Sequence, residues 1–126
     1  NPKAIFIVTN QGGIEKGLFP ESFIYVKCEY VNDSIMDYCD INTRFMYCGS
    51  NDRNNPMRKP NTGMLEELFN NYKSWNDGLS EKDCLMIGDA SGLEGQFSDS
   101  DKKTAENFGI DYMDVSEFVN IYGKGV

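Results

Sequence analysis

Apolar and polar positions follow two different periods along this chain, and the two periods alternate. Short apolar runs bounded by glycine or polar residues are typical of buried strands, whereas apolar positions at i, i+3 or i+4 and i+7 indicate half-buried helices. The apolar runs predict strands over residues 4–8, 44–48, 84–87 and, more weakly, 110–113. The helical spacing predicts helices over residues 21–40, 62–75, 101–108 and 115–122.

The spacing also predicts which side chains each of the longer helices buries. The first helix is expected to bury Ile24, Cys28, Val31, Ile35 and Tyr38. The second is expected to bury Leu65, Leu68, Phe69 and Tyr72. The last is expected to bury Val115, Phe118, Val119 and Tyr122, with Asp114 and Glu117 spaced as a capping box at its start.

Strands that alternate with helices predict an α/β fold, in which a parallel sheet is covered by helices on both faces. We expect a single domain over residues 1–126, since no repeat, low-complexity segment or linker interrupts the chain. The segments that follow the strands are then expected to converge on one edge of the sheet, where open α/β sheets bind ligands.

Composition narrows the possible functions. The net charge is −8, which argues against a broad basic surface that binds nucleic acid along its length. No apolar run is long enough to span a bilayer and no signal peptide is visible, so we expect a cytoplasmic protein that does not enter a membrane. The chain has no histidine, which excludes Ser–His and Cys–His catalysis, and its four cysteines form no C-x-x-C pair, which disfavours a zinc site.

The end of the first predicted strand carries the strongest candidate site. Thr9 offers a hydroxyl, and the following residues Asn10, Gln11, Gly12 and Gly13 can turn backbone N–H groups toward an anion. Together they suggest a phosphate pocket. The plainer interpretation is a glycine-rich turn between a strand and a helix.

Three further segments offer charged side chains near the other strand ends. Arg58 and Lys59 precede the second helix, where a lysine can reach an anion, although a basic pair beside proline is usually a solvated loop. Asp89 follows the third strand, where a carboxylate suits either a metal ion or a simple turn. Asp101 lies in a Ser/Asp segment that reads as an ordinary helix cap, and only its proximity to Asp89 suggests a second carboxylate near a metal.

These signals, in this order, resemble the haloacid dehalogenase superfamily of phosphohydrolases. The resemblance is to the branch that contains the polynucleotide kinase 3′-phosphatase domain, histidinol phosphatase and the heptose bisphosphate phosphatase. It rests on VTNQGGIEKG, RKPNTGM, and IGDASG followed by FSDSDKKTAENFGI, and it covers most of the chain. The resemblance implies a three-layer, Rossmann-like parallel sheet and a magnesium-dependent (Mg2+) phosphatase.

The resemblance also implies roles for the candidate residues. Thr9 and the Asn10 amide would hold phosphoryl oxygens, as part of a substrate site with Gln11, Gly12 and Arg58. Lys59 would neutralise charge on the nucleophile and on the transferring phosphoryl group. Asp89 would bind Mg2+, and Asp101 would orient the metal shell or Lys59.

One motif of the superfamily is absent from the chain. Its members attack with an aspartate of a D-x-D motif that ends a strand upstream of the T-N-Q strand, and the D-x-D here is Asp99–Asp101, in the acidic motif. We therefore expect an N-terminally incomplete domain that lacks its first, central strand and is inactive by itself. An N-terminal piece or another chain would complete the sheet.

Two functions follow, and a third interpretation shares only the architecture. The first is a phosphomonoesterase that forms an aspartyl-phosphate once the missing motif is supplied, acting on a 3′-phosphorylated nucleic acid end or on a small sugar or nucleotide phosphate. The second is an inactive, phosphatase-like binding module. A receiver-like or flavodoxin-like domain would not explain the TNQGG and RKPNTGM segments.

Overall fold

The computed structural model describes residues 2–41, 43–76 and 78–123, and the chain forms two compact units, Asn1–Arg58 and Lys59–Val126. The N-terminal unit contains β1 (Ile5–Asn10), α1 (Ser22–Cys39) and β2 (Thr43–Cys48). The C-terminal unit contains α2 (Gly63–Lys73), a short 3-10 helix (Glu81–Asp83), β3 (Leu85–Gly88), α3 (Ser100–Phe108), β4 (Asp111–Asp114) and α4 (Val115–Tyr122).

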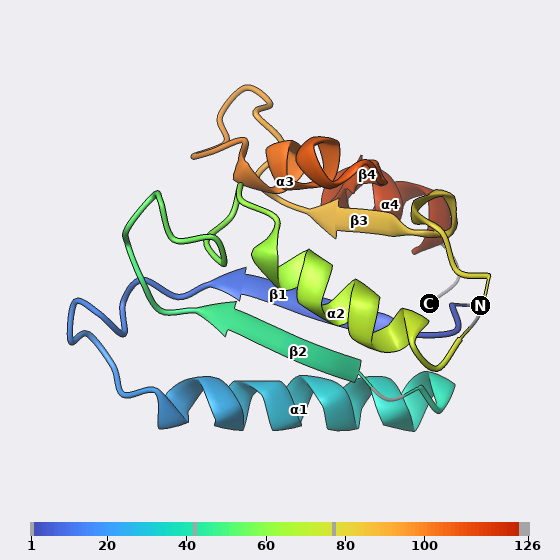
Figure 1. Ribbon diagram of the computed structural model, residues 1–126, viewed down its shortest axis with the longest axis horizontal. Helices are drawn as coiled ribbons and strands as arrows, with labels where there is room; N and C mark the ends of the chain where they lie inside the picture. Colours follow the sequence, from blue (N-terminus) through green and yellow to red (C-terminus); the bar gives the residue numbers. More distant parts are fainter. Residues whose placement is uncertain (1, 42, 77, 124–126) are drawn as a thin grey trace. The chain divides into compact units, whose positions relative to one another are not determined.

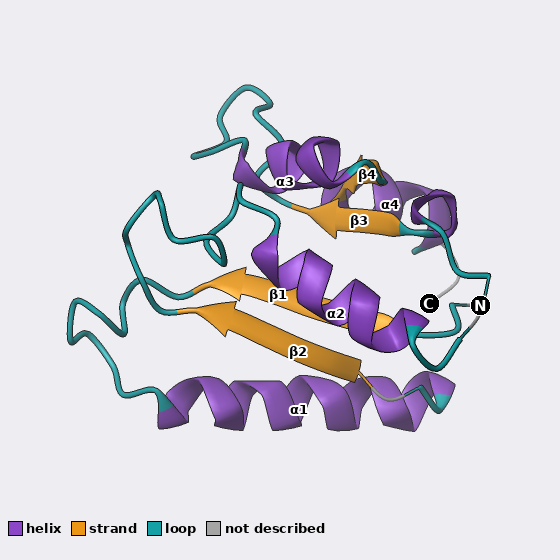
Figure 2. Ribbon diagram, in the orientation of Figure 1, coloured by secondary structure: helices purple, strands orange, loops and turns teal. Residues whose placement is uncertain are grey.

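The N-terminal unit is a parallel pair of strands with one helix packed beside it. β1 and β2 pair in register from Ile5 opposite Thr43 to Asn10 opposite Cys48. Both arrows point the same way in Figure 2, so the loops that follow the two strands leave from the same edge. α1 lies alongside the pair (Figure 1) and contributes the buried Ile24 to the core of this unit.

The C-terminal unit is built around a second parallel pair. β3 pairs with β4 from Leu85 opposite Asp111 to Gly88 opposite Asp114, and α3 and α4 pack against these strands. α2 meets α3 through Phe69 and Phe108, whose rings make an edge-to-face contact with centroids 5.5 Å apart. The buried apolar side chains of this unit are Met64, Leu65, Leu68, Phe69, Met86, Ala90 and Ala105.

The predicted α/β class and order of elements are confirmed, with bounds that differ by at most two residues at each end. The strands form two short parallel sheets rather than one continuous sheet within the described residues. The three-layer arrangement and the single domain stay predictions. None of the helices in the described segments is both long enough and apolar enough to cross a bilayer.

Several burial predictions were wrong. β1 is half-buried along its whole length rather than buried. Val31 lies at the surface and Tyr38 is 90% exposed, because the two-stranded β1–β2 pair is too narrow to cover the whole apolar stripe of α1. On α4, Val115, Val119 and Tyr122 are exposed, since the short β3–β4 pair is too narrow to cover a whole helix face.

The predicted capping motifs form with different partners. Asp114 caps α4, but its Oδ1 accepts from the N–H and the hydroxyl of Ser116, at 2.8 and 2.5 Å, instead of forming a reciprocal box with Glu117. At the start of α3 the hydroxyl of Ser98 accepts the Ser100 N–H at 3.0 Å, and Asp99 makes no side-chain cap. In both cases the side chain accepts a backbone N–H only two residues ahead, so the turn it closes is tighter than that of a capping box.

Candidate functional site

The predicted site residues fall into two sets, one in each unit. Thr9, Asn10, Gln11, Gly12 and Arg58 belong to the N-terminal unit, whereas Lys59, Asp89 and Asp101 belong to the C-terminal unit.

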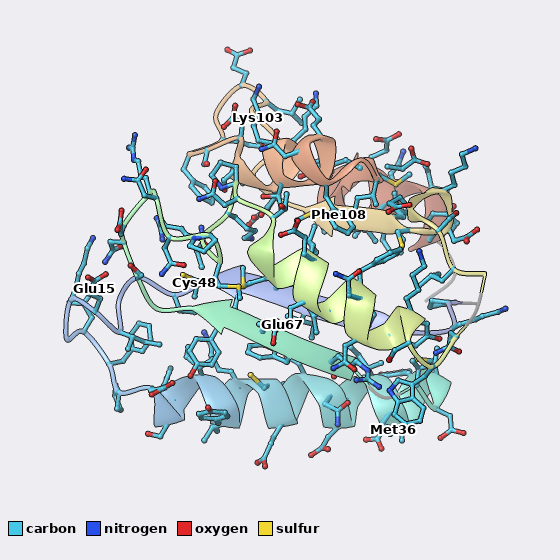
Figure 3. All side chains as sticks on the ribbon, viewed as in Figure 1. Glu15, Met36, Cys48, Glu67, Lys103 and Phe108 are labelled. Carbon is cyan, nitrogen blue, oxygen red and sulfur yellow. The ribbon has the colours of Figure 1, made fainter. Side chains whose placement is uncertain are left out.

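The first set lies where β1 and β2 end together. The pairing continues past β1, since the Gln11 N–H donates to the Cys48 carbonyl at 2.7 Å. The Gln11 side-chain amide turns back and donates to the Thr9 hydroxyl at 2.9 Å. Figure 3 labels Cys48 at this end of β2 and Glu15 in the loop that follows β1. The structure therefore brings Thr9 and Gln11 together at one strand edge.

Gly12 is held by a residue that the sequence analysis did not single out. The Asn51 side-chain amide donates to the Gly12 carbonyl at 2.9 Å, and the Asn51 N–H donates to the Glu15 carboxylate. A Cβ on Gly12 would stand 2.0 Å from the Asn51 Oδ1 atom, so this close approach requires glycine.

The glycine pair leaves backbone donors available. Within the described part of the chain, the N–H groups of Gly12 and Gly13 donate to no protein group, while the turn closes through the Ile14 N–H on the Gln11 carbonyl at 3.1 Å. Successive unpaired N–H groups at a turn form a concavity that favours an anion. This part of the prediction therefore has a geometry suited to phosphate.

Arg58 has a structural contact of its own. Its Nη1 donates to the Ser50 carbonyl at 3.0 Å and so ties down the loop that carries Asn51. A guanidinium group has five N–H donors, and this bond uses one of them. Arg58 thus supports the loop and retains donors for a ligand.

In the second set, Lys59 and Asp101 form an ion pair with Nζ and Oδ1 2.5 Å apart. Their side chains are 12% and 8% exposed, so the pair is largely withdrawn from water. A lysine held in this way is a fixed positive charge at the start of α3. Fixed charges of this kind stabilise anionic transition states without further reorganisation.

Asp101 also fixes the backbone next to Asp89. Its Oδ2 accepts the Ala90 N–H at 3.2 Å, and the Ala90 carbonyl accepts the N–H groups of Asp101 and Lys102, each at 3.1 Å. Gly88 allows this approach, because a Cβ there would stand 2.5 Å from the Asp101 Oδ2. Asp89 itself is exposed, between a strand end and this clamped residue.

The oxygen donors fit a hard cation only in part. The exposed carboxylate of Asp89 is the kind of ligand that Mg2+ takes, and Mg2+ normally completes its shell with water and phosphate oxygens. Both Asp101 oxygens already accept hydrogen bonds, which favours its role in orienting Lys59 over direct metal binding. Among the described residues no three or more His, Cys, Asp or Glu side chains cluster in a way that could hold a metal ion.

A hydrogen-bond network beside Asp89 was missed by sequence reasoning. The Ser91 hydroxyl donates to Asp114 Oδ2 at 2.6 Å and lies 2.5 Å from the Tyr112 hydroxyl. The Gln96 amide donates to the same Asp114 oxygen at 2.8 Å. The only sequence signal was the position of these residues in and after the glycine-rich loop, since their spacing matches no motif.

The surroundings of Asp114 and Tyr112 in this network shift the pKa values of both side chains. Hydrogen bonds from Ser116, Ser91 and Gln96 hold the pKa of Asp114 well below its usual range. Burial raises the pKa of Tyr112, and the charges of Asp101, Asp114 and Asp89 add to this effect. Tyr112 therefore stays a neutral phenol that donates to Ser91, and Ser91 donates to an ionised Asp114.

The sequence of this chain matches known phosphatases. The family described as polynucleotide kinase 3 phosphatase matches residues 1–119. A probable D-glycero-D-manno-heptose-1,7-bisphosphate 7-phosphatase of Thermoplasma volcanium is 30% identical over 95 residues, which are 75% of this chain and 62% of that protein. The histidine biosynthesis bifunctional protein HisB of Legionella pneumophila is 29% identical over 117 residues, 88% of this chain and 28% of that protein.

The chain thus spans less than two thirds of the length of these two curated relatives. No solved structure was found to match it. The family match nevertheless covers nearly the whole sequence, and it contains every residue of both candidate sets. The chain belongs to the polynucleotide kinase 3 phosphatase family, within the haloacid dehalogenase superfamily of phosphatases.

Proposed function

We propose that this chain is part of a phosphomonoesterase that requires Mg2+ and acts through an aspartyl-phosphate. The observation that carries the proposal is the buried ion pair between Lys59 and Asp101, beside the exposed carboxylate of Asp89. A fixed cation next to a metal-binding carboxylate supplies the positioning and charge stabilisation on which phosphoryl transfer depends.

Each candidate residue has a role in this proposal. Thr9, Asn10 and the backbone N–H groups of Gly12 and Gly13 bind phosphoryl oxygens, with Gln11 holding the Thr9 hydroxyl. The remaining roles belong to charged side chains. Lys59, held by Asp101, neutralises charge on the transferring phosphoryl group. Arg58 contacts the substrate, and Asp89 holds Mg2+. When bound, Mg2+ supplies positive charge against the phosphoryl oxygens.

The aspartate nucleophile is proposed to come from a strand that this chain does not contain. Each described sheet has two strands, so β1 and β3 each have a hydrogen-bonded strand on one side only within the described segments. Leu85 and Ile87 on β3 are 45% and 40% exposed, as expected of a strand with an open edge and an uncovered face. In the Rossmann-like, three-layer sheet that the resemblance implies, the missing strand lies between β1 and β3 and carries the D-x-D motif at its end.

Two substrate classes are compatible with the proposal. The family description favours a 3′-phosphate at the end of a polynucleotide. The name of the Thermoplasma relative and the net charge of −8 favour a small phosphate ester. Parallel assays on a 3′-phosphorylated oligonucleotide and on small sugar and nucleotide phosphates separate the two.

A second candidate function is phosphate binding without turnover. It is favoured by the state of the D-x-D motif found in these 126 residues, Asp99–Asp101. The second aspartate of this motif is already paired with Lys59. A module of this kind binds phosphate or vanadate through the same residues but releases no product.

The test compares the 126-residue chain with the polypeptide encoded by its full reading frame. Mg2+-dependent phosphate release by the latter, lost in Lys59→Ala, supports the phosphatase. Vanadate binding with no release from any phosphate ester supports the binding module instead. Lys103→Ala is the matched control, because Lys103 pairs with Glu106 at the surface, 3.9 Å away.

A further inference from the structure

The loop that follows Asp89 is tied together at its base. The N–H groups of Asp101 and Lys102 donate to the Ala90 carbonyl, and the Gly92 N–H donates to the Ser98 carbonyl at 3.0 Å. These bonds join the two ends of the loop immediately beside the proposed metal ligand. The segment 92–98 therefore projects from a fixed base.

Gln96 fixes the interior of the same loop. Its Oε1 accepts the N–H groups of Ser91 and Leu93, at 2.8 and 3.1 Å, and its Nε2 donates to Asp114 at 2.8 Å. The Gln96 N–H donates to the Leu93 carbonyl at 3.0 Å. One side chain thus joins both arms of the loop to the start of α4.

Phe97 lies between two of these fixed residues, Gln96 and Ser98, and is nevertheless 82% exposed. Within the described residues its ring stacks on no other aromatic side chain, while other phenylalanines do, such as Phe69 on Phe108. A single exposed apolar residue is ordinary. A ring carried by an immobilised backbone beside a proposed reaction site is pre-organised for contact, because little conformational entropy is lost when a ligand binds it.

The surroundings of Phe97 indicate what it contacts. Phe97 precedes Asp101 by four positions, so their Cα atoms are at most about 15 Å apart, within reach of the part of a substrate that lies beyond its phosphate. Glu94 and Asp99 on the same loop repel further phosphates. An uncharged, flat group that stacks on the ring meets no such repulsion, and nucleobases have this chemistry.

We propose that Phe97 is a specificity-determining residue that stacks on the nucleobase of a 3′-phosphorylated nucleotide. This inference rests on the proposed function, since it uses the same site. It favours nucleotide esters over sugar phosphates. Gln96 is the positioning residue, because it holds the backbone that carries the ring.

A fluorescence measurement tests the contact without relying on activity. Trp75 is the single tryptophan of the chain, so a Trp75→Phe/Phe97→Trp variant places one fluorophore in the loop. Its emission is expected to be quenched by thymidine 3′-phosphate and by a 3′-phosphorylated oligothymidine, but not by glycerol phosphate. The wild-type protein, with Trp75 80% exposed outside the loop, is the control and is expected to show no quenching.

Kinetics of the full-reading-frame polypeptide provide the second measurement. Phe97→Ala is expected to raise the KM for nucleotide 3′-phosphates about tenfold, within the range of stacking contributions, and to leave glycerol phosphate hydrolysis unchanged. Phe97→Tyr is expected to restore the KM, and Gln96→Ala is expected to raise it without changing the pH profile. A greater effect on the oligonucleotide than on the mononucleotide identifies a polynucleotide end as the source of the base.

The outcomes separate this inference from the proposed function. Equal quenching by glycerol phosphate, no quenching by either nucleotide, or an unchanged KM in Phe97→Ala with phosphate release intact overturns the role of Phe97 alone. Base-dependent quenching without phosphate release from any ester supports the stacking contact and overturns the proposed phosphatase.

Discussion

Lys59 and Asp101 are 42 residues apart in sequence, yet they form an ion pair of 2.5 Å with both side chains largely buried. The pair joins the segment before α2 to the first turn of α3. Because Asp101 also accepts the Ala90 N–H, one carboxylate sets the position of both a cation and the backbone beside Asp89. This shared carboxylate links the stability of the C-terminal unit to its proposed chemistry.

Breaking this pair is expected to destabilise the C-terminal unit. Lys59→Ala leaves the Asp101 charge buried without its lysine, which costs about 3 kcal/mol. Lys59→Met/Asp101→Asn removes both charges and is expected to cost less than the sum of the single changes. Urea unfolding measures Lys59→Ala, Lys59→Met, Asp101→Asn and the double variant, with Lys103→Ala as a surface control expected to change stability by less than about 0.5 kcal/mol. Equal effects of Lys59→Ala and Lys103→Ala would contradict the burial of the pair.

Gly88→Ala tests the close approach of β3 to α3. The added Cβ would stand 2.5 Å from the Asp101 Oδ2 and 2.8 Å from its Cβ, so Asp101 must move. We expect a loss of about 1–3 kcal/mol in the free energy of unfolding. Gly49→Ala is the matched control, because its nearest contact is an ordinary 3.5 Å to Ile14. A Gly88→Ala protein as stable as the control would show that the two residues are not in contact.

Asn51 and Gly12 are expected to behave as a coupled pair in the N-terminal unit. Asn51→Ala removes the bond to the Gly12 carbonyl and costs about 1 kcal/mol. Gly12→Ala costs more, because its Cβ overlaps the Asn51 amide. The double variant relieves this overlap and is expected to be more stable than Gly12→Ala alone, as thermal unfolding can measure. Additive losses would mean that Asn51 does not cover Gly12.

The Asp114 network predicts a dependence of stability on pH. The folded-state pKa of Asp114 lies below the ordinary value of about 3.9, so its ionised form stabilises the fold above that pH and the contribution is lost as the pH falls below it. Asp114→Asn removes this titration. The stability difference between wild type and Asp114→Asn is therefore expected to shrink between about pH 5 and pH 3, measured as urea midpoints. A constant difference over this range would contradict the network.

Local patterns in the sequence were enough to predict where the helices and strands lie, but not which of their side chains are buried. The apolar period placed β1 and α1 correctly, because strand and helix periods are properties of neighbouring residues. The exposure of Tyr38 and Val119 depends on how wide a sheet stands opposite each helix, and a two-stranded pair leaves part of the face uncovered. That width is set by strand pairing, which the local pattern does not specify.

The candidate site residues likewise divide into those that the sequence alone could identify and those that it could not. Lys59, Asp89 and Asp101 were singled out because charges next to predicted strand and helix ends are conspicuous in a sequence. Asn51 and Gln96 were not, since an amide in a polar loop has no distinguishing pattern until a backbone group meets it. Their roles follow from geometry alone.

The most direct test of the central claim is the release of inorganic phosphate from a 3′-phosphorylated oligonucleotide by the full-reading-frame polypeptide. The assay compares Mg2+ with a chelator, and wild type with Lys59→Ala and Asp89→Asn. We predict release that requires Mg2+, falls at least a hundredfold in Lys59→Ala, and is lost in Asp89→Asn. Absence of release from this oligonucleotide and from small phosphate esters, or release that both substitutions leave unchanged, would contradict a phosphatase built on these residues.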